Sequence, residues 1–317
     1  INFEKINQLI QQNKFLDAQK LIKNLLNSDE RNQDLLLQLA GIYRSLGKFD
    51  KARETYFKIT QIDETNTTAH RLLIDYLEKE EIDNYEKKLD KIKSIDISDK
   101  KKVELFFSLG ILNEKKKNFK ISANYFIEAN KLKRKIVPFN FINLQSHFEN
   151  LKIVFEKLNF DKKKFQNQKK IIFIIGLPRS GTSLVESILG ANKNIYSAGE
   201  IPNLKKIIRD NFTIDGSLNY EKIIQSANNE KTDIYKMYIN HSNLKDVNLD
   251  IITDKNTENF KFLGLINIFF ENAKIINCIR DPFENFCSLY KTNFNSATLN
   301  WTNSMKEISL YHKNYFQ

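Results

Sequence analysis

A short loop between an apolar run and a helical pattern carries the side chains best suited to bind an anion. It follows Ile171–Ile175 and reads Gly176-Leu177-Pro178-Arg179-Ser180-Gly181-Thr182-Ser183. A glycine loop that leads from a strand into a helix presents backbone N–H groups and the positive end of the helix dipole. Arg179 adds a planar guanidinium that suits a tetrahedral oxyanion. The segment therefore predicts a site for a phosphate or sulfate group.

Gly176 and Gly181 are spaced as in the Walker A loop, G-x-x-x-x-G-K-[ST], but Thr182 stands where that motif has lysine. Nucleotide-hydrolysing loops use the lysine on the β- and γ-phosphates and a hydroxyl on Mg²⁺. This loop instead offers an arginine and the hydroxyls of Thr182 and Ser183 at the start of a helix. It predicts a 5′-phospho site that needs neither a metal ion nor a γ-phosphate.

Further charged residues follow the loop at the ends of apolar runs or in short turns. Glu200 ends the turn Ala198–Glu200, and Lys255 follows Thr253 and Asp254. Arg280 ends an apolar run, and Ser288 lies about two turns into the helix expected next, so both can face one pocket. Considered singly, Glu200 could be a structural cap, Lys255 a surface lysine, and Arg280 a partner in a structural ion pair. Their order behind the loop favours one shared site.

The run Gly176–Leu189 resembles the 5′-phosphosulfate-binding loop of sulfotransferases, especially the bacterial tetratricopeptide-repeat sulfotransferases and the tyrosylprotein sulfotransferases. The later segments resemble, in the same order, that family's acidic turn, its lysine segment and its 3′-phosphate-binding segment. The resemblance covers residues 169–317. It implies a PAPS-dependent sulfotransferase, in which 3′-phosphoadenosine 5′-phosphosulfate (PAPS) donates the sulfuryl group and no metal is required.

The resemblance also implies roles for single residues. Glu200 would be the general base, Arg179 would stabilise the transferring sulfuryl oxygens, and Lys255 would neutralise the leaving oxygen. The residues implied to hold the donor's phosphates are Pro178, Arg179, Ser180, Gly181, Thr182, Ser183, Arg280 and Ser288. Several other sulfotransferase families use a histidine base, for which His241 is a weaker candidate in a polar stretch.

Three features depart from the family pattern. Asn256-Thr257 stand where the family usually has Met-Pro, and Phe283-Glu284 stand where it often has Arg-Asp, which removes a basic contact. The sequence also ends at Gln317, whereas the family continues further. We therefore expect a C-terminally incomplete domain, and the first residue, Ile1, suggests a missing N-terminus.

The second half of the sequence alternates between strand and helix patterns. Apolar runs at Ile171–Ile175, Ile251-Ile252 and Ile275–Ile279 read as strands, and Leu184–Leu189 reads as a helix. Strands that alternate with helices predict a parallel sheet. With the resemblance, this indicates an α/β, P-loop-like domain of three layers.

The first half contains a repeat. A short turn followed by an aromatic residue recurs at Phe15, Phe49, Tyr85 and Phe119, with a small residue, Ala18 or Ala52, three positions after the first two. A period near 34 residues with a turn between two helices is typical of tetratricopeptide repeats. The small residues would let paired helices approach closely, and the aromatics would fill the space between repeats. We expect about four repeats, the third degenerate, in an all-α domain.

These patterns predict tetratricopeptide-like helices over residues 1–137 and a connecting helix and linker over 138–168. The resemblance implies a sulfotransferase domain over 169–317. Within the connector, Phe148, Leu151, Phe155 and Leu158 share one helical face. The lysine-rich segment Lys162–Lys170 reads as a solvated linker.

Composition narrows the class of protein. A hydrophobic content of 41% and a charged content of 28% are typical of soluble globular proteins, and no apolar run approaches the roughly 18 residues of a membrane helix. The net charge of +11 suits an anionic substrate; nucleic-acid binding would rest on that charge alone. Cys278 and Cys287 lack metal-ligand spacing and read as thiols in a reducing compartment. We therefore expect a cytoplasmic bacterial protein.

The sequence leaves the acceptor open between a peptide tyrosine, a sugar hydroxyl and a small metabolite. The repeats could present a peptide or recruit a protein partner. Two other functions remain possible at this stage. One is a binding scaffold with an inactive transferase domain, and the other is a P-loop kinase or NTPase.

Overall fold

The computed structural model describes residues 3–11, 14–157, 169–228, 233–242 and 244–316. The chain divides into two compact units. The first comprises Ile1–Pro138 with Tyr290–Ser304, and the second comprises Phe139–Leu289 with Met305–Gln317. The lysine-rich segment predicted as a linker lies largely outside the described residues.

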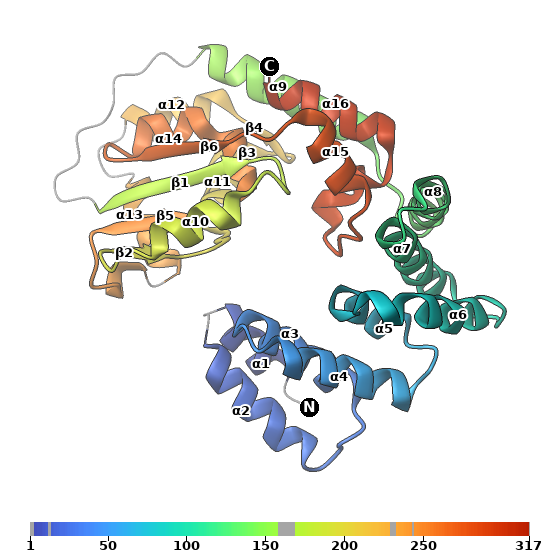
Figure 1. The fold of residues 1–317 in the computed structure, drawn as a ribbon. Coiled ribbons are helices and arrows are strands. Elements are labelled where there is room, and N and C mark those ends of the chain that lie inside the picture. The colour runs from blue at the N-terminus through green and yellow to red at the C-terminus, as the bar shows by residue number, and fades with distance from the viewer. Residues whose placement is uncertain (1–2, 12–13, 158–168, 229–232, 243, 317) are drawn as a thin grey trace. The chain divides into compact units, whose positions relative to one another are not determined.

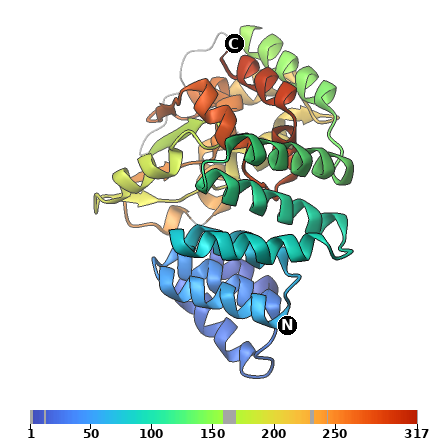
Figure 2. The same ribbon diagram turned by 45° about the vertical axis from the view of Figure 1, so that its right-hand side comes forward.

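The first unit is helical (Figure 2). Most of its helices pack against their neighbours in sequence, as in tetratricopeptide repeats, but α5 packs against α7 rather than against α6. They are α1 (Phe3–Gln11), α2 (Phe15–Leu26), α3 (Gln33–Ser45), α4 (Phe49–Ile62), α5 (Thr67–Leu73), α6 (Ile82–Lys93), α7 (Asp99–Lys115) and α8 (Phe119–Ile136), with the 3₁₀ turns η1 (Ile74–Tyr76), η2 (Lys79–Glu81) and η5 (Ala297–Asn303).

The repeat spacing predicts these helices well, with two corrections. Ala18 and Ala52 are fully buried, as expected for close helix packing. Phe49 and Phe119, however, begin α4 and α8 with largely exposed side chains, so the prediction that they fill the space between repeats is wrong. The turn expected before Tyr85 lies earlier, because Tyr85 is inside α6 and packs edge-on against the buried His70.

The first unit also takes in a segment from the second half of the sequence. The side chain of Asn130 donates to the carbonyl of Tyr290 at 2.9 Å, and Lys133 is buried with its ammonium on the Asn293 side chain at 2.5 Å. Burial lowers the pKa of Lys133 to about 8. These contacts place residues 290–304 with α8, whereas the sequence predicts one uninterrupted domain from 169 to 317.

The second unit contains the sheet (Figure 1). Its strands are β1 (Lys170–Gly176), β2 (Ile195–Ser197), β3 (Thr213–Ile214), β4 (Ser217–Leu218), β5 (Ile251–Asp254) and β6 (Lys274–Cys278). Its helices are α9 (Phe141–Lys157), α10 (Thr182–Gly190), α11 (Asn203–Phe212), α12 (Tyr220–Asn228), α13 (Ile234–His241), α14 (Leu263–Phe269), α15 (Pro282–Tyr290) and α16 (Met305–Phe316), with 3₁₀ turns η3 (Leu244–Asp246) and η4 (Thr257–Phe262).

Four strands form a parallel sheet in the order β2-β5-β1-β6, and β3 and β4 form a separate hairpin. In the sheet register, Ile171 lies beside Ile252 of β5, and Ile175 lies beside Asn277 of β6. The parallel sheet predicted from the alternating pattern is therefore confirmed. Strand β2 was not predicted, because three half-exposed residues give no apolar run.

Helices cover both faces of the sheet (Figure 1). On one face, Ile172 and Ile174 pack with Val185 and Leu189 of α10. On the other, Phe173 joins a core formed with α9, α11, α12, α13 and α14. Leu151 and Val154 of α9 are buried in that core, which is why the predicted connecting helix belongs to the second unit. None of the described helices is long and apolar enough to cross a bilayer.

Candidate functional site

The loop between β1 and α10 needs glycine at both of its ends. Gly176 has a φ of +153°, and a Cβ there would lie 2.7 Å from the carbonyl oxygen of Cys278 on the adjacent strand. Gly181 has a φ of +98° and is the N-cap of α10, whose first turn has no side-chain cap. The first N–H groups of a helix have no intrahelical acceptor. The loop therefore presents uncapped donors, as an anion site requires.

Arg179 lies at the tip of this loop in an unusual conformation. Its φ of +69° is left-handed, which is uncommon for a residue other than glycine and often marks a functional loop. Its Nε donates to the Oγ of Ser288 at 3.1 Å. The structure thus brings together two predicted site residues that the sequence separates by 109 positions.

Helix α15 and the residues before it hold the loop from the β6 side. The side-chain amide of Asn285 donates to the carbonyl of Pro178 at 2.9 Å, and Nη1 of Arg280 donates to the carbonyl of Arg179 at 3.3 Å. Arg280 also forms an ion pair with Glu284, with 3.1 Å between Nε and Oε2. Glu284 stands where the family often has aspartate, and its carboxylate here pairs with the arginine predicted to bind the 3′-phosphate.

The hydroxyl-bearing residues of the loop differ in exposure. Ser183 is exposed, Thr182 is buried, and Ser180 is half-buried. The Oγ of Ser180 is itself buried, and among the described residues it has no hydrogen-bond partner. It lines a small cavity together with Arg280 and Asn285, on the side of the loop that faces α15.

Glu200 and Lys255 form the second part of the site. The Nζ of Lys255 lies 2.6 Å from Oε1 of Glu200. The lysine side chain is 11% exposed and the glutamate side chain 65% exposed, so the carboxylate faces solvent while the ammonium is largely enclosed. They meet because β2 and β5 are adjacent parallel strands, whose carboxyl ends lie at the same edge of the sheet.

Backbone hydrogen bonds hold these two turns together. The amide of Lys255 donates to the carbonyl of Gly199 at 2.9 Å, and the amide of Ala198 donates to the carbonyl of Thr253 at 3.3 Å. Asn256, which replaces the family's usual methionine, donates from its side chain to the carbonyl of Ile201 at 3.0 Å. Its Oδ1 accepts from the amide of Glu258 and caps η4. This departure therefore supplies contacts of its own.

A buried carboxyl group lies directly before Lys255. Asp254 is fully buried and accepts hydrogen bonds from the Tyr238 hydroxyl at 2.8 Å and from the Asn256 amide at 2.9 Å. Burial, together with the negative charge of Glu186, raises the pKa of Asp254 to about 7. Burial also raises the pKa of Tyr238 well above its ordinary value.

Glu186 on α10 is a residue that the sequence analysis missed. It is buried, and its Oε1 accepts hydrogen bonds from the amide of Gly199 at 3.0 Å and from the hydroxyl of Thr253 at 2.8 Å. The available signal was a lone acidic residue within the apolar helix Leu184–Leu189. A single glutamate on a helix usually faces solvent, so this signal is weak.

His241 lies away from these groups. It ends α13 with an exposed side chain and lines a hollow with Ile207 and Asp210 of α11. None of the other predicted site residues lines that hollow. The position gives no support to His241 as an alternative base.

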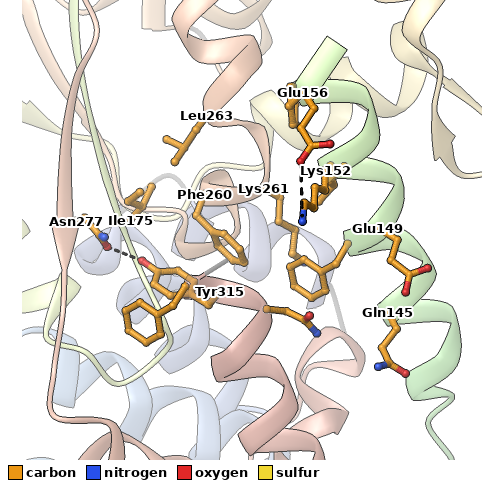
Figure 3. A pocket seen from close by; sticks show the side chains of 15 residues that line it. Gln145, Glu149, Lys152, Glu156, Ile175, Phe260, Lys261, Leu263, Asn277 and Tyr315 are labelled. Carbon is orange, nitrogen blue, oxygen red and sulfur yellow. Dashed lines mark hydrogen bonds and ion pairs between the residues drawn. The ribbon is translucent and has the colours of Figure 1, made fainter. Parts of the chain in front are cut away.

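The second unit also has a cavity of about 670 Å³, between α9, α14 and α16 (Figure 3). It is lined by aromatic side chains, including Phe260, with Lys152, Glu149 and Glu156 of α9 at its rim. Tyr315 lines the side of the cavity that is opposite α9, and its hydroxyl donates a hydrogen bond to Asn277 of β6. None of the predicted site residues lines this cavity, which lies on the α9 face of the sheet.

The predicted residues thus form two groups at the carboxyl edge of one parallel sheet. One comprises the loop with Arg179, Arg280 and Ser288, and the other comprises Glu200 and Lys255. Ligands of open α/β sheets bind at this edge. The first group offers donors and positive charge to an anion, and the second offers a solvent-facing carboxylate beside an enclosed ammonium.

Comparisons with known proteins agree with helical repeats in the first half of the chain and a sheet domain in the second. Residues 172–317 match the model of the sulfotransferase family, and residues 9–73 match that of the tetratricopeptide repeat. An uncharacterized protein of Aquifex aeolicus is 26% identical over 297 residues. The match covers 90% of this chain and 38% of that relative, so the chain spans less than half of the relative's length. The second half of the chain thus matches the sulfotransferase family, and the first half carries a match to the tetratricopeptide repeat.

Proposed function

We propose that the second half of the chain transfers a sulfuryl group from PAPS to an acceptor hydroxyl. The observation that carries this proposal is the position of Glu200 beside Lys255, at the same sheet edge as the uncapped loop with Arg179. The match of residues 172–317 to the sulfotransferase family supports sulfuryl transfer in general. The site residues, the donor and the acceptor rest on the sequence resemblance and on the geometry.

The loop residues would hold the 5′ end of the donor. The uncapped backbone N–H groups at the start of α10 and the hydroxyl of the exposed Ser183 would suit phosphate oxygens. Pro178, Ser180, Gly181 and Thr182 shape the loop around them. Arg179 would stabilise the charge on the transferring sulfuryl oxygens, as arginine does in phosphoryl transfer.

Arg280 and Ser288 would hold the 3′-phosphate. Both already contact Arg179, Arg280 through the Arg179 carbonyl and Ser288 through the guanidinium. This proximity favours a ligand whose two phosphate groups are joined by one ribose. Glu284 competes for Arg280, so we expect the 3′-phosphate to bind less tightly than it would without that carboxylate.

Glu200 and Lys255 would act on the two oxygen atoms between which the sulfuryl group is transferred. A bond forms between the acceptor oxygen and sulfur, and the bond from sulfur to the bridging oxygen breaks. Glu200 takes the acceptor's proton, and Lys255 neutralises the bridging oxygen, which keeps the electron pair on the departing bisphosphate. General-base catalysis of this kind contributes about 10²- to 10⁴-fold to the rate.

The acceptor is a hydroxyl compound, and we consider a peptide tyrosine and a carbohydrate. The repeats in the first unit suit the capture of a peptide or of a protein that carries the acceptor. Transfer of radiolabelled sulfate from PAPS to tyrosine-containing peptides and to oligosaccharides, with EDTA present, tests the proposal. Label in an acceptor supports it. Release of phosphate from ATP that depends on Mg²⁺ would instead indicate a nucleotide-hydrolysing enzyme.

A further inference from the structure

Helix α10 reaches both parts of the proposed site. Its first residue, Thr182, follows the phosphate loop, and Glu186 lies four residues later. Residues four apart share one face of a helix, and both of these side chains are buried. The same nine-residue helix therefore ends the donor loop and, one turn further on, contacts the turn that bears Glu200.

Glu186 contacts that turn at its glycine, Gly199. Gly199 has a φ of +72°, and its amide donates to Glu186 Oε1. The same oxygen accepts from the Thr253 hydroxyl on β5, next to the strand end that precedes Lys255. One buried carboxylate oxygen thus connects the turn of the proposed base with the strand of the proposed catalytic lysine. The Glu200 side chain itself is mostly exposed, so its position depends on such contacts of the turn.

We propose that Glu186 is a positioning residue that fixes the Glu200 turn relative to the phosphate loop. The inference rests on the proposed function for its catalytic meaning, since Glu200 is the base only in that proposal. A hydrogen bond to a charged acceptor stabilises a structure more than one to a neutral acceptor does. Loss of the acceptor should therefore loosen the turn locally, while α10 and β1 remain folded.

Two substitutions with side chains of similar length distinguish the effect of the hydrogen-bond acceptor from that of side-chain packing. Glu186→Gln keeps an oxygen that can accept both hydrogen bonds, whereas Glu186→Met fills a similar space without an acceptor. Ser187→Ala is the matched control, because Ser187 is the exposed neighbour on the same helix. The readout is amide hydrogen exchange of peptides that span 198–201, compared with peptides from β1 and α10.

In the full chain we expect Glu186→Met to exchange the 198–201 amides roughly ten- to a hundredfold faster, as the loss of a charged hydrogen bond predicts. Glu186→Gln should retain most of the protection, and Ser187→Ala should match the wild type. If Glu186→Met does not fold, Thr253→Val removes one of the two donors and should still accelerate exchange severalfold in this turn. Unchanged exchange in both variants, or an equal acceleration across β1 and α10, overturns the positioning role.

Titration of the same proteins with adenosine 3′,5′-bisphosphate separates this inference from the proposed function. Bisphosphate binding by the wild type and by Glu186→Met, with exchange accelerated only in the variant, supports both. If the protein does not bind the bisphosphate but protection of the turn still depends on Glu186, the sulfotransferase site is overturned and the positioning role of Glu186 remains. Bisphosphate binding together with exchange that is insensitive to Glu186 supports the sulfotransferase site and overturns the positioning role of Glu186.

Discussion

Lys255 and Glu200 form an ion pair with 2.6 Å between Nζ and Oε1, although 55 positions separate them in the sequence. The pair joins the ends of two adjacent parallel strands, and the backbone of each turn is bonded to the other. The two side chains therefore act at one place. That arrangement suits a reaction in which a proton is removed from one oxygen while charge develops on another.

Glu200→Gln should remove the base and keep the site's shape. We expect turnover to fall about 10²- to 10⁴-fold, because the amide cannot accept the acceptor's proton. Affinity for adenosine 3′,5′-bisphosphate should stay close to that of the wild type, since the carboxylate acts on the acceptor. Rates of label transfer from PAPS and calorimetric titration check the two parts. Equal losses in turnover and in affinity would indicate a structural role for Glu200.

Glu284→Gln should strengthen binding of the 3′-phosphate. The substitution removes the carboxylate that lies 3.1 Å from Arg280 and leaves the guanidinium free for a ligand. Exposed ion pairs contribute about 0.2–1 kcal/mol, so the gain should be about one- to fivefold. The gain should appear with adenosine 3′,5′-bisphosphate and not with 5′-AMP. Arg280→Ala should have the opposite effect, and a similar response to both nucleotides would argue against a 3′-phosphate site at Arg280.

Asp254 should make the sheet domain less stable as pH rises. Its folded-state pKa is raised to about 7 from an ordinary value of 3.8, so the folded state keeps a proton that the unfolded state loses. The group's contribution is complete below about pH 4 and is lost as pH rises through 7, by at most about 1.4 kcal/mol per pH unit.

Asp254→Asn should remove this slope. Denaturant-dependent hydrogen exchange of β1 and β5 at several pH values between 4 and 8 measures it. The stability of the wild type should fall relative to the variant as pH rises. Parallel pH profiles for the two proteins would contradict the raised pKa of Asp254.

Gly176→Ala should destabilise the phosphate loop. The added methyl group would lie 2.7 Å from the Cys278 carbonyl oxygen, at a φ that side chains rarely adopt. Such backbone strain costs about 1–3 kcal/mol. Gly41→Ala is the control, since the new Cβ there meets nothing within 4 Å in helix α3. Thermal unfolding checks both, and an equal effect of the two substitutions would exclude steric strain at Gly176.

Local sequence patterns predict the elements that carry long apolar runs. Strands β1 and β6 and helices α4 and α8 lie close to where the patterns place them, because their periodicity is set within a few residues. Three-residue β2 has no such pattern. The packing of residues 290–304 with α8 depends on contacts such as Asn130 with Tyr290, across 160 positions, which no local pattern reveals.

The site shows the same limit. The loop, Lys255 and Arg280 follow apolar runs that predict parallel strands, so the sequence predicts one shared site for them. Glu200 joins that site only through the resemblance of its turn, because β2 gives no apolar run. The contacts that hold these residues do not follow from these patterns. Glu186 becomes visible as a partner of Gly199 only when α10 is placed against β5.

The central claim is that the loop with Arg179 and Arg280 binds a 3′,5′-bisphosphorylated nucleotide without a metal. Calorimetric titration with adenosine 3′,5′-bisphosphate, 5′-AMP and ATP in EDTA tests it most directly. Arg179→Ala serves as the site variant, and Arg209→Ala, an exposed arginine on α11, serves as the control. We predict that the bisphosphate binds about ten- to a hundredfold more tightly than 5′-AMP, as expected from an added charged contact. Of these two variants, only Arg179→Ala should weaken binding of the bisphosphate. Tighter binding of ATP than of the bisphosphate, or bisphosphate binding that is unchanged in Arg179→Ala, would contradict the claim.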